Sequence, residues 1–97
     1  MNYSLHPEAS EDLREAAGFY RDHAGTELAQ SFLAEFERSV AMLLGHSRLG
    51  SLWRPGRRRL VMRRFPYSVV YTVSADELRI LAVAHHSRRP AYWRGRR

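Results

Sequence analysis

Residues 26–45 carry the feature that most constrains the fold, an apolar stripe whose members recur at helical spacing. The stripe consists of Ala29, Phe32, Leu33, Phe36, Val40, Leu43 and Leu44. Because an α-helix turns once about every 3.6 residues, this spacing places the whole stripe on one face of a helix that ends at Gly45. Such a helix is stable only when its apolar face is buried, so the segment predicts a domain of two packed layers.

A second helix is predicted directly upstream, beginning at Pro7. Proline suits the first turn of a helix, where its missing N–H is not needed. A narrower stripe of mostly small residues follows, made of Ala9, Leu13, Ala16, Ala17 and Tyr20. Gly25 is expected to end this helix, and Thr26 is expected to be the N-cap of the next one. The short link predicts an antiparallel helical hairpin that rests on a sheet.

The other segments predict strands and one loop. Residues 2–6 alternate in polarity and predict an edge strand, whereas residues 45–56, with three glycines and a proline, predict a loop. Residues 58–64, 67–73 and 77–85 predict the three strands of an antiparallel meander. In the middle strand, Tyr67 and Tyr71 share a face with Val69 and are expected to be core aromatics.

The predicted fold class is therefore α+β, in the order strand, helix, helix, strand, strand, strand. An N-terminal strand and an antiparallel helical hairpin are expected to pack on a small antiparallel β-sheet. A chain of 97 residues is the size of one domain. We expect residues 1–97 to form that domain, with residues 86–97 as a basic C-terminal tail.

Charge is distributed very unevenly along the chain. Residues 1–47 hold three arginines and eight carboxylates, a formal charge of −5, whereas residues 48–97 hold thirteen arginines and two carboxylates, a formal charge of +11. Guanidinium groups bind phosphate or carboxylate through two parallel hydrogen bonds and stay charged at neutral pH. The C-terminal half is therefore expected to bind a polyanion or an acidic partner.

Composition excludes several classes of chemistry. The chain has no cysteine, which removes disulfides, thiolate metal sites and thiol nucleophiles. No apolar run approaches the roughly 20 residues of a membrane span, and the N-terminus lacks the pattern of a signal peptide, so a cytoplasmic protein is expected. His85 and His86 are adjacent in a strand and are predicted to point to opposite faces, so we expect no metal site there and no cofactor.

Three segments resemble one protein family. They read FPYSVVY at residues 65–71, ILAVAHH at residues 80–86 and RRPAYW at residues 88–93. Together with the predicted hairpin and the basic ending, they resemble toxins of the RelE/ParE superfamily of type II toxin–antitoxin systems, over nearly the whole chain. The resemblance implies a cognate antitoxin that holds the toxin inactive. It also implies one of two targets, DNA gyrase or the ribosome with its messenger RNA.

The ribosome-dependent members cleave mRNA without metal, and the resemblance assigns candidate residues for that reaction. His86 or Tyr92 would serve as general acid or base, and Arg63, Arg64 or Arg89 would clamp the phosphate. The pattern departs from those members at two places. They usually present an arginine after the aromatic that opens the middle strand, where this chain has Ser68, and their catalytic arginine near the end of the last strand falls at His86.

These departures favour the ParE-type members, which resemble plasmid stabilisation toxins, arrest growth and act on DNA gyrase. An mRNA endonuclease is the alternative, and a non-toxic RNA-binding domain is a second alternative. The residues expected to bind the target or a phosphate lie beside aromatics at strand ends, namely Arg63, Arg64, Arg88, Arg89 and Trp93. Arg94, Arg96 and Arg97 are expected to be a frayed, solvated end, and Arg57 to Arg59 a charged edge strand.

Overall fold

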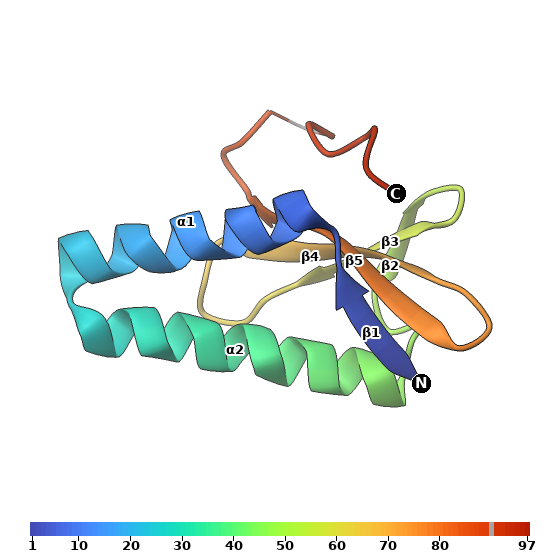
Figure 1. Ribbon diagram of the computed structural model, residues 1–97, viewed down its shortest axis with the longest axis horizontal. Coiled ribbons are helices and arrows are strands. Elements are labelled where there is room, and N and C mark those ends of the chain that lie inside the picture. Colours follow the sequence, from blue (N-terminus) through green and yellow to red (C-terminus); the bar gives the residue numbers. More distant parts are fainter. Residues whose placement is uncertain (90) are drawn as a thin grey trace.

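The computed structural model describes residues 1–89 and 91–97, so Pro90 of the RRPAYW segment lies outside the described residues. Two helices and a five-stranded sheet follow one another in the order β1, α1, α2, β2, β3, β4, β5 (Figure 1). The helices are α1 (Pro7–Ala24) and α2 (Thr26–Gly45). The strands are β1 (Asn2–Leu5), β2 (Ser51–Arg54), β3 (Arg57–Val61), β4 (Tyr67–Val73) and β5 (Glu77–His85). The α+β fold class predicted from the sequence is confirmed.

The helical hairpin forms as predicted, but its link differs in one detail. His6 caps α1, because its Nδ1 atom accepts a hydrogen bond from the backbone N–H of Glu8 at 3.0 Å. Gly25 both ends α1 and precedes α2, with φ of 99°, a value that side-chain-bearing residues rarely adopt. Thr26 is therefore the first residue of α2, and its predicted role as N-cap is wrong. The single-residue link holds the two helices antiparallel.

The sheet has the strand order β1-β5-β4-β3-β2 and is mixed. β1 pairs with β5 in parallel, with Tyr3 opposite Leu78 and Leu5 opposite Ile80, whereas the other neighbours are antiparallel. The predicted sheet was antiparallel throughout, so this edge is a correction. The parallel edge arises because the chain leaves β1, forms the whole hairpin, crosses to the far edge and returns through the meander (Figure 1).

The segment predicted as a loop contains a strand. β2 pairs with β3 in a hairpin that turns at Gly56, where φ is 73°. β3 is therefore an inner strand, and the reading of Arg57 to Arg59 as a protected edge is wrong. The predicted strand at residues 58–64 is displaced as well, because β3 ends at Val61 and the turn to β4 begins before Arg64, whose φ is 70°.

One face of the sheet packs against the helical hairpin and forms the main core. Phe32, Phe36, Val40 and Leu43 of α2 meet the inward side chains of β4 and β5 there. Tyr67 and Tyr71 belong to this core, with exposed fractions of 7% and 0%, which confirms them as core aromatics. No helix among the described residues is long and apolar enough to cross a membrane.

The opposite face, here called the outer face, carries a separate apolar cluster of Val70, Leu81, Ala82 and Trp93. An irregularity in the β4–β5 pairing creates it: Val70 lies opposite Ala82, but Tyr71 lies opposite Ile80, which leaves Leu81 as an extra residue in β5. The C-terminal segment, residues 86–89 and 91–97, passes over this face, on the side of the sheet away from α2 (Figure 1).

Candidate functional site

The outer face contains a hollow, here called the outer hollow, between the sheet and the C-terminal segment. Its lining residues are Trp53, Arg59, Ser68, Val70, Ala84, His85, His86, Arg88, Arg89, Ala91, Tyr92 and Trp93. These residues come from β2, β3, β4, β5 and the C-terminal segment. The hollow therefore brings together most of the residues that the sequence singled out for function.

A hydrogen bond links the side chains of Ser68 and His86 at one side of the hollow. The Oγ atom of Ser68 lies 3.0 Å from Nε2 of His86, and Ser68 is buried. The backbone N–H of His86 donates to the carbonyl of Pro66 at 2.8 Å, which ties the β3–β4 turn to the end of β5. His85 points to the other face, where its ring packs edge-on against Tyr67 at a centroid distance of 4.9 Å. The predicted opposite facing of the two histidines is confirmed.

An ion pair between Asp12 of α1 and Arg96 holds the C-terminal segment in place. Nη1 of Arg96 donates to Oδ2 of Asp12 at 2.6 Å, and both side chains are more than nine-tenths buried. Arg96 was predicted to belong to a frayed end, and its burial corrects that prediction. Because an unpaired buried charge is costly, the two groups depend on each other.

The Asp12–Arg96 pair also supplies hydrogen-bond partners to the backbone of β5 beyond the end of β1, its neighbour at this edge of the sheet. The last backbone bond on that side joins the N–H of His6 to the carbonyl of Ile80. Beyond it, Oδ2 of Asp12 accepts from the N–H of Val83 at 3.2 Å, and Nη1 of Arg96 donates to the carbonyl of Leu81 at 3.0 Å. Buried backbone groups need such partners. The ion pair thus provides hydrogen-bond partners for an edge of β5 that no strand covers.

Tyr92 belongs to this arrangement. Its hydroxyl donates to Oδ2 of Asp12 at 3.2 Å, and the guanidinium of Arg88 lies over its ring at 4.1 Å from the centroid. Burial, followed by the negative charge of Asp12, raises the pKa of Tyr92 from 10.0 to about 12. The hydroxyl is therefore protonated at neutral pH and points at a carboxylate.

The two tryptophans form a wall of the hollow. Their ring centroids lie 5.1 Å apart, with Trp93 4% exposed and Trp53 36% exposed. Trp93 packs on Val70 and Leu81, so the structure gives it a packing role. The predicted contact of Trp93 with a target stays a prediction.

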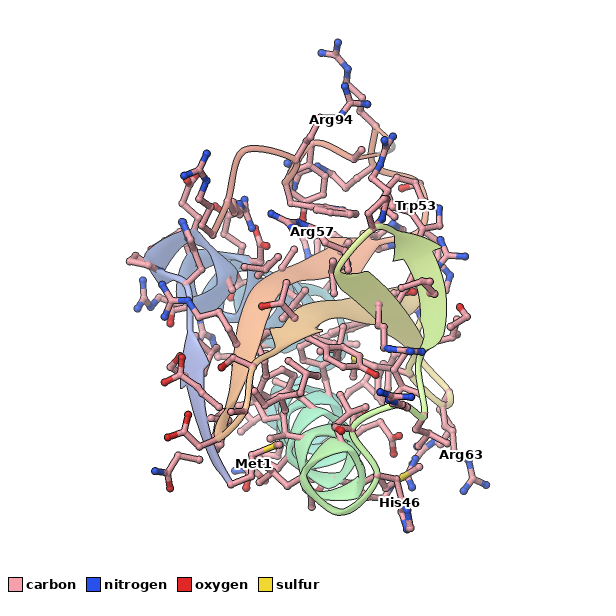
Figure 2. The ribbon with its side chains drawn as sticks, turned by 90° about the vertical axis from the view of Figure 1, so that its right-hand side faces the viewer. Met1, His46, Trp53, Arg57, Arg63 and Arg94 are labelled. Carbon is pink, nitrogen blue, oxygen red and sulfur yellow. The ribbon has the colours of Figure 1, made fainter. Side chains whose placement is uncertain are left out.

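Arg63 and Arg64 do not line the outer hollow. Both lie in the β3–β4 turn, where the backbone N–H of Arg63 donates to Oε2 of Glu35 on α2 at 3.4 Å. Figure 2 labels Arg63 on the side of the sheet that holds α2, and Arg57 and Arg94 on the opposite side. The structure therefore separates these two arginines from Arg88 and Arg89, with which the sequence had grouped them.

Sequence reasoning missed two participants of the site. Asp12 was counted only among the eight carboxylates of the N-terminal half, and Arg96 was expected to be solvated. Arg59 was expected to lie in a charged edge strand, whereas it lines the outer hollow from an inner strand. The pairing of Asp12 with Arg96 spans 84 positions, and neither residue lies in a recognisable local motif.

Comparisons with known proteins agree on one family. The family model described as "ParE toxin of type II toxin-antitoxin system, parDE" matches residues 3–90. Among solved structures, a chain of the chromosomal ParDE toxin–antitoxin system from P. aeruginosa is similar, with a TM-score of 0.77 and 25% sequence identity over 88% of this chain and 95% of that chain. No curated protein matches the chain.

Proposed function

The chain belongs to the ParE toxin family of type II toxin–antitoxin systems, and from this membership we propose that it arrests growth by binding DNA gyrase. It performs no hydrolysis of its own. A cognate antitoxin binds the free toxin and holds it inactive. Both proteins, like gyrase, act in the cytoplasm.

The engagement of Tyr92 with Asp12 is the observation that carries this choice over mRNA cleavage. The Tyr92 hydroxyl lies 3.2 Å from Oδ2 of Asp12, a carboxylate that also binds Arg96, so this hydroxyl is held by the fold. Its proton already binds Asp12. Ser68, at the position where the nucleases of the superfamily carry an arginine, is bonded to His86. The candidate nuclease residues are thus engaged with one another and with the fold.

The outer face is the surface that we assign to gyrase. Arg88 and Arg89 are exposed there, directly after β5. The Asp12–Arg96 pair fixes the segment that carries them, so little conformational entropy is lost when a partner binds.

The antitoxin is expected to use the helix side. A second hollow lies between α1 and the end of β5, and Ala16, Phe19 and Tyr67 contribute to its lining. Phe19 is 55% exposed, which leaves an apolar anchor for a partner. The basic C-terminal half attracts an acidic segment, so association should be fast and sensitive to salt.

Induction of the toxin without its antitoxin tests the target. The gyrase proposal predicts a DNA-damage response and loss of negative supercoiling while messenger RNAs stay intact. Prompt cleavage of transcripts on intact chromosomes would contradict it. Purified toxin should also inhibit supercoiling by purified gyrase.

Variants of the candidate catalytic residues give a second test. The change His86→Ala combined with Tyr92→Phe removes both candidate acid–base groups while it keeps the ring beneath Arg88. Growth arrest should persist in this double variant. Its loss, with the fold intact by circular dichroism, would point to the nuclease.

A further inference from the structure

Three guanidinium groups line the outer hollow and form no ion pair among the described residues, and one of them, Arg88, also lines the second hollow with Asp12 and Glu15. Arg59 comes from β3, and Arg88 and Arg89 come from the C-terminal segment. None of the described lining residues is acidic. Among the described residues, the ion pairs involve other arginines. Clustered like charges destabilise a compact protein, so such a cluster favours an anionic ligand.

Two further lining residues are polar. The Ser68 hydroxyl and the His86 ring lie at the side of the hollow, joined by their hydrogen bond. A phosphodiester offers two charged oxygens, and guanidinium groups bind such oxygens in pairs. The hollow therefore combines charge with hydrogen-bond donors.

Two further arginines lie on the same side of the sheet as the hollow. Arg57 lies next to the C-terminal segment, because its Nη2 donates to the carbonyl of Arg96 at 3.3 Å. Arg94 is exposed at the turn of that segment, and Figure 2 places it with Arg57 and Trp53 on the side opposite Arg63. Several cations on one side of the sheet suit a polyanion better than an isolated ion.

We propose that the outer hollow binds a phosphodiester group of a DNA strand, held by Arg59, Arg88 and Arg89. The assignment to DNA rests on the proposed function, because gyrase acts on DNA and the toxin would meet the strand in that complex. No bond is made or broken. The contact adds affinity for DNA-bound gyrase without reading base sequence.

Intrinsic fluorescence measures occupancy of the site directly. The chain has two tryptophans, and both line the outer hollow. Purified toxin is titrated with a single-stranded oligodeoxynucleotide of about eight nucleotides. Parallel titrations use an RNA of the same sequence, a glutamate-rich peptide and inorganic phosphate. The oligodeoxynucleotide should bind most tightly, with an affinity that falls as salt rises.

Variants that each remove one positive charge distinguish specific binding of DNA at the hollow from general electrostatic attraction of DNA to the protein. Arg59→Gln and Arg89→Gln should each weaken DNA binding about tenfold and lower the salt slope by about one. Arg63→Gln removes the same charge from the helix side and should change the affinity less than about twofold.

Three results would overturn the proposal. Equal weakening by Arg59→Gln and Arg63→Gln would reduce the effect to net charge. Tighter binding of the glutamate-rich peptide would make the hollow a protein contact, and preference for the RNA would assign it to a different nucleic acid. Because gyrase is absent from the titration, failure of the gyrase proposal would appear separately, as unchanged supercoiling by purified gyrase beside normal DNA binding.

Discussion

Different interactions stabilise the structure on the two faces of the sheet. The helix face is a continuous apolar core in which Phe32 and Leu43 are fully buried. The outer face has only a small apolar cluster, and the segment above it is held by the buried Asp12–Arg96 pair. Apolar burial has no preferred direction, whereas an ion pair fixes one arrangement of its partners. The first face makes the domain stable, and the second holds arginines at defined positions.

The largest effect is expected on the helix face. Phe32→Ala should lower the free energy of unfolding by about 4 kcal/mol, because it leaves a cavity among closely packed rings. Urea denaturation followed by circular dichroism measures the loss. Phe19→Ala, at an exposed ring of α1, serves as the control and should change stability by less than about 0.5 kcal/mol. Similar losses in both variants would contradict the assigned core.

Removal of Asp12 comes next. Asp12→Ala should cost about 3 kcal/mol, because it leaves the Arg96 guanidinium buried without its partner and the N–H of Val83 without an acceptor. The same denaturation assay applies. Glu15→Ala, an exposed carboxylate on the same helix, should have little effect. If the two variants lose equal stability, the pair does not hold the segment.

A double variant tests whether the Asp12–Arg96 pair stabilises the fold through its charges or through its hydrogen bonds to the backbone of β5. Replacing both charges, as Asp12→Leu with Arg96→Met, removes the unpaired charge but leaves the backbone groups of Leu81 and Val83 without partners. We expect the double variant to remain about 2 kcal/mol less stable than the wild type, since each buried unpaired backbone group is costly. Full recovery of stability would show that the hydrogen bonds to the backbone of Leu81 and Val83 contribute nothing to stability.

The smallest effect concerns the pH dependence of Tyr92. Its folded pKa of about 12 lies above the unfolded value near 10, so its contribution to stability is complete below pH 10 and is lost as pH rises toward 12. Burial also raises the pKa of Tyr20, Tyr67 and Tyr71, so most of the tyrosinate absorbance should appear late in an alkaline titration, and Tyr92→Phe should lower the amplitude of this late rise. Loss of an early step instead would contradict the burial of this hydroxyl.

The contrast between the faces also explains what the sequence could reveal. The stripe on α2 and the alternation in β4 are local patterns, and they predicted the hairpin and the meander. The Asp12–Arg96 pair joins distant positions that carry no local signal, so the frayed-end prediction failed. β2 was missed because residues 51–54 neither alternate nor form a long apolar run. Most of the functional candidates that line the outer hollow were named from the sequence, but Arg63 and Arg64 were also grouped with them. This grouping was wrong because a turn and a bulge decide on which face of the sheet each arginine lies.

We propose that the outer face is the face with which this toxin inhibits gyrase. Inhibition of supercoiling by purified gyrase, measured over a concentration series of toxin, tests it most directly when Arg89→Gln is compared with Arg63→Gln. We expect half inhibition by Arg89→Gln to need about tenfold more toxin, while Arg63→Gln behaves as the wild type. Equal inhibition by both variants, or a larger loss for Arg63→Gln, would contradict it.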